Sequence, residues 1–178
     1  MNRSLSSARQ GGFSMIEVLI TLVVTAFGLL GLAGFVTRTT AVSVDAMQRA
    51  RAAALLADMG NRIQNNKANA GSYVTGNVQG ETTQTCAVAM GASRDLCEWN
   101  NLLAGANDAL TSGASQALTY RGCITQPTPG DPLYVVTVAW GATLIGVTPA
   151  DGCAAGSFGN DTNRRVIRTQ VRIATLSA

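Results

Sequence analysis

The residues of this chain that could do chemistry are few, and the most unusual is a single glutamate. Glu17 is the only charged residue within residues 13–36, which otherwise read as a membrane helix. A lone carboxylate at membrane depth costs about 3 kcal/mol or more, so it calls for a cation partner. The nearest basic residues, Arg9 and Arg38, are distant in sequence. An amine on Phe13, made by a cut just before it, would lie one helical turn away; the alternative is an acid that snorkels to the membrane surface.

The remaining reactive residues are four cysteines, and the chain has no histidine. Without histidine, Ser–His and Cys–His nucleophiles are excluded. Paired carboxylates and phosphate-binding loops are also missing from the sequence, so we expect neither an enzyme nor a cofactor or metal site. An even number of widely spaced cysteines indicates two disulfides in an oxidising compartment. Three pairings are possible; we favour Cys86–Cys97 and Cys123–Cys153 because each closes a modest loop, but the sequence leaves the pairing open.

The N-terminal 36 residues predict a leader followed by a membrane span. Residues 1–12 are polar, contain Arg3 and Arg9 and have no acid. The 24 residues from 13 to 36 would form a helix of about 36 Å, enough for a hydrocarbon core of about 30 Å. A cleaved secretory signal has a shorter apolar region, of about 7–15 residues. The two arginines predict a cytoplasmic N-terminus in the inner membrane, with the rest of the chain periplasmic.

The helix should continue beyond the membrane as an amphipathic half, residues 37–66. No proline precedes Pro127, and four apolar residues share one face of this half at helical spacing. They are Ala52, Leu56, Met59 and Ile63. A helix over residues 13–66 would be about 80 Å long, more than a small domain needs, so its apolar end must pack in lipid or against other helices.

The rest of the chain predicts a loop region and then a sheet. Residues 67–116 read as a loop with one short helix, in which Leu96, Trp99 and Leu103 share a face. From residue 117 to 178 the pattern changes to alternation, with strands expected at 117–124, 133–140, 142–147 and 164–175. Short links favour an antiparallel sheet of about four strands, covered by the apolar stripe of the long helix. The predicted class is therefore α+β.

Four arginines, Arg164, Arg165, Arg168 and Arg172, lie near the C-terminus of a chain whose net charge is only +3. Such a cluster could contact phosphate or anionic lipid. Arg168 and Arg172 alternate with apolar residues, however, which favours the solvent-facing side of a strand. We therefore expect no direct binding of nucleic acid.

The segment "GGFSMIEVLITLVV" resembles the processing site of type IV prepilins. It follows a short basic leader and has glycine at the cut, an aromatic first residue and a glutamate four residues later. The resemblance implies that prepilin peptidase cuts between Gly12 and Phe13 and methylates the amine of Phe13. It also implies that Glu17 recruits and registers the subunit in a filament. The family's fold is a long N-terminal helix with a C-terminal antiparallel sheet, in agreement with the pattern above.

Further segments, among them "ALLADMGNRIQNNKANAGSY" and "YVVTVAW", are similar to minor pilins of type IV pili. The chain differs from major pilins in two ways. Its apolar helix has no proline, and its cysteines are not a single pair near the C-terminus. The resemblance implies a structural subunit that primes pilus assembly with other minor pilins, the major pilin and a tip adhesin, in support of twitching motility and attachment. The alternatives are a minor pseudopilin of a type II secretion system and a membrane-anchored periplasmic binding module that keeps its leader.

Overall fold

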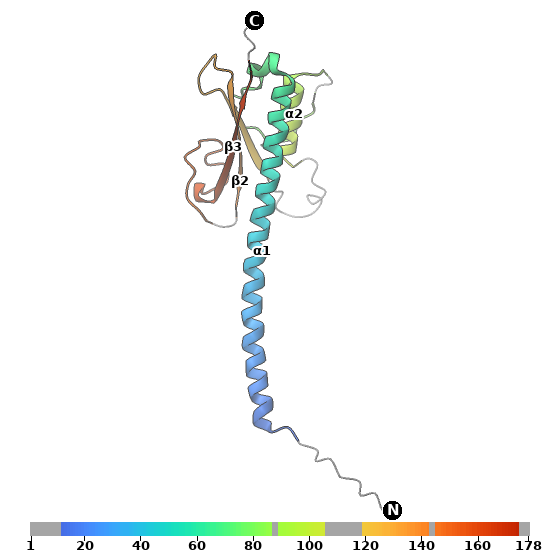
Figure 1. Ribbon diagram of the computed structural model, residues 1–178, viewed down its shortest axis with the longest axis vertical. Coiled ribbons are helices and arrows are strands. Elements are labelled where there is room, and N and C mark those ends of the chain that lie inside the picture. The colour runs from blue at the N-terminus through green and yellow to red at the C-terminus, as the bar shows by residue number, and fades with distance from the viewer. Residues whose placement is uncertain (1–11, 87–88, 106–118, 143–144, 175–178) are drawn as a thin grey trace, which may run out of the picture. The chain divides into compact units, whose positions relative to one another are not determined.

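The computed structural model describes residues 12–86, 89–105, 119–142 and 145–174. The predicted leader, apart from Gly12, lies outside them. The elements in chain order are α1 (Met15–Asn65), the 3-10 helix η1 (Lys67–Tyr73), α2 (Ala92–Leu103), β1 (Tyr120–Thr125), β2 (Leu133–Gly141), the 3-10 helix η3 (Asp161–Asn163) and β3 (Arg164–Arg172) (Figure 1). This is the predicted α+β arrangement of a long N-terminal helix followed by a small antiparallel sheet. The chain divides into two compact units, Met1–Val42 and Ser43–Ala178.

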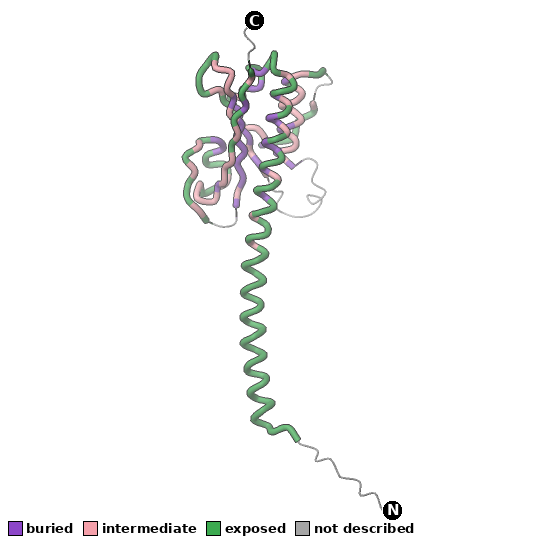
Figure 2. The backbone as a smooth tube through the Cα atoms, in the orientation of Figure 1, coloured by how far each residue is buried: buried purple, intermediate pink, exposed green. Residues whose placement is uncertain are grey.

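The described part of the first unit is dominated by the first half of α1, whose residues are mostly apolar. Figure 2 shows that this half is exposed. From Met15 to Val36 every large apolar side chain is between 48 and 87 % exposed. The threonine hydroxyls in this stretch bond within the helix; Thr25, for example, donates to the carbonyl of Thr21 at 2.6 Å. Such internal bonds suit a surrounding without water, because these hydroxyl groups then need no outside partner. By length and composition, α1 can cross a membrane.

In the second unit, one face of α1 is buried against the sheet. Its buried residues include the four predicted from helical spacing, Ala52, Leu56, Met59 and Ile63. The helix packs on the sheet at Gly60, where a Cβ would lie 3.6 Å from the side chain of Val171, an ordinary van der Waals distance. The second half of the helix is thus amphipathic, as its sequence predicts, and it covers the apolar face of the sheet.

The short helix α2 packs on the same apolar core. Its predicted face is buried: Trp99 and Leu103 are fully inaccessible, and Leu96 is partly buried against them. The indole nitrogen of Trp99 donates to the carbonyl of Leu55 in α1 at 3.0 Å. Glycine is needed at position 122 in β1, because a Cβ there would come within 2.2 Å of the Trp99 ring. This close approach fixes α2 on both α1 and β1.

The described sheet has three antiparallel strands in the order β1-β2-β3. The strands predicted at 117–124, 133–140 and 164–175 correspond to β1, β2 and β3. The fourth predicted strand, 142–147, is wrong for its described residues, 142 and 145–147, which belong to no strand. This stretch instead leaves the sheet, and the amide of Gly146 bonds the carbonyl of Thr162 beside the start of β3. Of the apolar residues described in this stretch, Ile145 and Val147 are exposed, so they do not form the buried face of a strand.

Candidate functional site

The predicted processing site lies at the start of α1. Gly12, Phe13 and Ser14 precede the helix and are exposed, and the Phe13 side chain is 84 % exposed. The carbonyl of Ser14 accepts from the amide of Glu17 at 3.0 Å and from that of Val18 at 3.3 Å, so Ser14 is the first residue held by the helix. The peptide bond between Gly12 and Phe13 therefore lies in non-helical, accessible backbone.

Glu17 occupies the first turn of α1 and is exposed. Within the part of the chain that the structure describes, its side chain forms no ion pair or hydrogen bond. Ser14 and Glu17 have the spacing of a capping box, a signal that the charge argument missed. A carboxylate in the first turn is stabilised by about 0.3–1 kcal/mol by the helix dipole, which offsets only part of the cost of burial in lipid. The geometry therefore leaves Glu17 available to a cation from outside the described residues.

Three glycines, Gly28, Gly31 and Gly34, lie in the apolar half of α1. A Cβ built on any of them would meet nothing within 4 Å. Contacts among the described residues therefore do not require glycine at these positions. Each glycine does lower the local bulk of the helix, and small residues allow another helix to approach closely.

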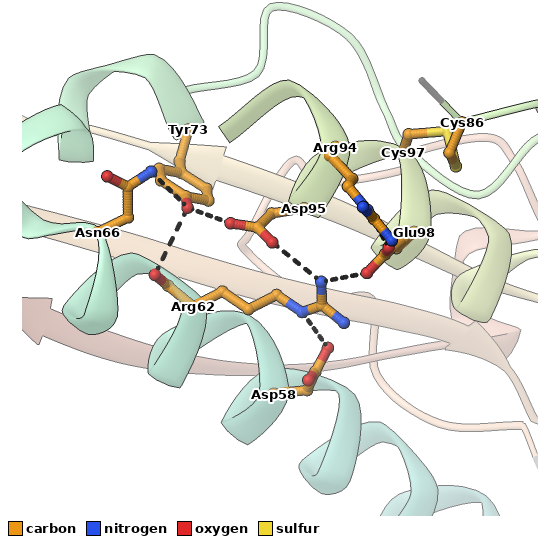
Figure 3. A network of polar contacts seen from close by, with 9 residues as sticks. All are labelled: Asp58, Arg62, Asn66, Tyr73, Cys86, Arg94, Asp95, Cys97 and Glu98. Atoms are coloured by element: carbon orange, nitrogen blue, oxygen red, sulfur yellow. Dashed lines mark hydrogen bonds and ion pairs between the residues drawn. A yellow bond between two sulfur atoms is a disulfide. The ribbon is translucent and has the colours of Figure 1, made fainter. Parts of the chain in front are cut away.

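A polar network that the sequence analysis missed joins α1, η1 and α2 (Figure 3). Arg62 of α1 donates from Nε to Asp58 at 2.9 Å and from Nη1 to Asp95 and Glu98 of α2, at 3.1 and 2.8 Å. Tyr73 of η1 donates its hydroxyl proton to the other oxygen of Asp95. The i,i+4 spacing of Asp58 and Arg62 is visible in the sequence, whereas the bonds between helices depend on the tertiary fold.

The network changes the proton affinities of its members. The hydrogen bonds from Arg62 and then Arg94 lower the pKa of Glu98, because they stabilise its charged form. Burial, followed by the hydrogen bond to Asp95, raises the pKa of Tyr73, because the negative phenolate is disfavoured beside a carboxylate. At neutral pH the network therefore holds an ionised Glu98 and a neutral Tyr73. Its geometry fixes the position of α2 rather than presenting a reactive group.

The structure pairs the cysteines as Cys86–Cys97 and Cys123–Cys153. These are the two pairs that the sequence analysis favours. The first bond attaches the chain before α2 to that helix, and the second attaches β1 to the loop between β2 and β3. Both therefore restrain loops around the sheet and α2.

Arg164 differs from the other arginines near the C-terminus, because it is buried, with only 1 % of its surface exposed. Its Nη1 donates to the carbonyls of Asp151 and Cys153, at 2.6 and 2.9 Å. The guanidinium also pairs with Asp161 at 3.2 Å. Arg164 therefore fixes the loop between β2 and β3 from within. Arg168 and Arg172 are exposed, as the alternation predicts.

Comparison with known proteins bears on the N-terminal residues. Residues 7–33 match the family model described as the prokaryotic N-terminal methylation motif. No curated protein and no solved structure matches the chain. The matched range contains Gly12, Phe13 and Glu17 together with most of the exposed apolar surface of α1. The match supports a pilin-like N-terminus of the kind that a prepilin peptidase processes in type IV pilins and pseudopilins.

Proposed function

We propose that this chain is a minor pilin of a type IV pilus, similar to PilV. The observation that carries the proposal is the methylation motif at residues 7–33 joined to a helix whose whole apolar half is exposed. An exposed apolar surface of this extent needs lipid before assembly and neighbouring helices afterwards. The chain would wait in the inner membrane, with its N-terminus cytoplasmic and its sheet periplasmic, and would then enter the pilus.

Processing by prepilin peptidase would create the cation that Glu17 lacks. The cut between Gly12 and Phe13 lies in exposed backbone just before the helix, which supports access by a peptidase. The same enzyme would then methylate the amine of Phe13. This amine, on the same chain or on a neighbour, would neutralise Glu17 when helices pack together. Association would thereby remove an unpaired charge from an apolar setting, which favours the assembled state and fixes the register of the subunit.

The second unit supports a role at a specialised position rather than along the fibre. Cys86–Cys97 and the Arg62 network hold the short helix α2 in place, and Cys123–Cys153 restrains the loop between β2 and β3. Together with the segments similar to minor pilins, these features favour a subunit of the tip complex. That complex would prime assembly and carry an adhesin, so twitching motility and adhesion would depend on the chain.

Two measurements in the native host test this function. A Glu17→Ala variant should be cut normally yet be depleted from sheared pili, whereas a Thr21→Ala variant, altered one turn further along the same helix, should be incorporated normally. Full incorporation of Glu17→Ala would contradict the charge-pairing role. Deletion of the chain should abolish piliation and leave protein export normal. Lost export with normal piliation would instead identify a minor pseudopilin of a type II secretion system.

A further inference from the structure

The two edges of the sheet differ in how they are covered. Strand β1 forms one edge, and the chain before α2 lies along it. Gln79 exchanges two backbone hydrogen bonds with Gly122, at 2.8 and 3.0 Å, and the amide of Thr75 donates to Ile124. Strand β3 forms the other edge. Among the described residues, backbone bonding along this edge is found just before the strand begins, where the amide of Gly146 donates to the carbonyl of Thr162 at 2.9 Å.

The register shows which backbone groups of β3 are free. Bonds from the Ala142 amide to the Asn163 carbonyl and from the Ile173 amide to the Pro132 carbonyl direct the odd-numbered residues toward β2. Because strand groups alternate, the amide and carbonyl groups of Val166, Arg168 and Gln170 point away from the sheet. Within the described ranges no backbone group pairs with them. The open edge, residues 166–172, is thus a row of unpaired donors and acceptors.

The side chains beside this open edge separate into two kinds. On the face away from α1, Arg168, Gln170 and Arg172 are exposed, and neither arginine forms an ion pair with any described residue. On the face toward α1, Ile167 and Ile173 are only partly buried against the core. In a strand added beside β3, side chains on one face would lie next to Arg168 and Arg172. Those on the other face would lie next to the partly exposed Ile167 and Ile173.

We propose that the open edge of β3 binds an extended segment of a partner protein in which acidic and apolar residues alternate. The backbone of that segment would pair with Val166, Arg168 and Gln170, as in strand addition to other sheets. Its acids would lie beside Arg168 and Arg172, and its apolar residues would cover Ile167 and Ile173. Charge complementarity selects this occupant.

A second copy of this chain is a poor occupant of the same edge. Two β3 strands paired through their open groups would place Arg168 opposite Arg172 when centred on Gln170, or opposite itself when centred on Arg168. Like charges directly opposite each other destabilise a strand pair. The arginines therefore disfavour self-association and favour an acidic segment. This inference concerns the second unit alone and does not depend on the proposed function.

Residue-resolved amide exchange of the full chain in detergent tests strand addition, with a blocked Glu-Val-Glu-Val-Glu peptide as the probe. In the free chain the outward amides of Arg168 and Gln170 should exchange quickly, and those of Ile167 and Thr169 slowly. The peptide should slow the two outward amides at least about ten-fold. A Lys-Val-Lys-Val-Lys peptide should leave them unchanged. Binding of the acidic peptide without slower exchange would overturn the proposal, since it would indicate only attraction of anions.

Substitutions separate the backbone contribution from the charge contribution. Gln170→Pro removes an outward amide, which an edge strand tolerates, and should weaken binding of the acidic peptide, whereas Gln170→Ala should not. Joint replacement Arg168→Glu and Arg172→Glu should reduce affinity for the acidic peptide by at least about ten-fold and transfer the preference to the basic one. Arg49→Glu, which reverses the charge of an exposed arginine in α1, serves as the control. Unchanged affinity in the Gln170→Pro chain or in the double variant would refute the proposed edge.

Discussion

Replacing Arg62 with methionine should destabilise the second unit, because Arg62 joins three carboxylates from two helices. Methionine keeps most of the apolar stem and removes only the guanidinium. The Arg62 side chain is 22 % exposed, and its partners Asp58, Asp95 and Glu98 are 38, 26 and 36 % exposed. These ion pairs are therefore partly exposed to solvent, and water can solvate the three carboxylates once the guanidinium is removed.

The size of the effect follows from this intermediate exposure. Fully exposed pairs contribute about 0.2–1 kcal/mol each, and hydrogen bonds to charged groups contribute about 1.5–3 kcal/mol. Three partly exposed ion pairs that each contribute about 1 kcal/mol predict a loss of about 2–3 kcal/mol in the free energy of unfolding. The same substitution at Arg49, which is exposed on the same helix, should change that free energy by less than about 0.5 kcal/mol.

Denaturant unfolding of the full chain in mild detergent provides the assay. Both tryptophans, Trp99 and Trp140, are buried in the second unit, so tryptophan fluorescence follows that unit without a signal from the apolar helix. The midpoint for Arg62→Met should fall well below those of the parent and Arg49→Met. Equal midpoints for the two variants would refute the reasoning that this network fixes α2 on α1.

Three further results are expected from the same unfolding assay. Double Cys→Ser replacement at Cys123 and Cys153 should cost about 4 kcal/mol and at Cys86 and Cys97 about 3 kcal/mol, because the first bond closes the longer loop; the reverse order would contradict this chain-entropy account. Arg164→Met should cost about 3 kcal/mol or more, since the carbonyls of Asp151 and Cys153 lose their guanidinium donor and Asp161 loses its ion pair, and a loss below about 1 kcal/mol would show that the loop holds without it. The pKa of Glu98 is lowered in the folded chain, so its contribution is complete above about pH 4.3 and is lost as the pH falls through the folded pKa. Acidification should therefore destabilise the parent more than Arg62→Met, and equal pH dependence of the two would contradict the pairing.

Much of the fold follows from periodicity. The stripe from Ala52 to Ile63 predicted which face of α1 is buried, and alternation predicted the three strands. The stretch 142–147 shares that alternation and was predicted as a fourth strand, yet the amide of Gly146 bonds the carbonyl of Thr162 beside the sheet. The local sequence pattern cannot distinguish a strand from this arrangement, because the backbone amides can form hydrogen bonds in either.

The candidate site could be proposed from the sequence only where its residues are neighbours in the chain. Gly12, Phe13 and Glu17 lie within one short segment: the charge pattern indicated that Glu17 needs a cation, and the resemblance to type IV prepilins implied the cut between Gly12 and Phe13. The contacts of Arg62 with Asp95 and Glu98 span more than thirty residues, and their pairing depends on how α2 docks. Arg164 likewise reads as one more arginine of a strand, and only the loop folded over it shows that it is buried.

The central claim is that this chain is cut and modified at Phe13 before it assembles. Intact mass measurement and N-terminal sequencing of the protein from cells with active prepilin peptidase test it most directly. The account predicts a chain that begins with N-methylated Phe13 and lacks residues 1–12. A chain that still begins at Met1 in those cells would contradict it.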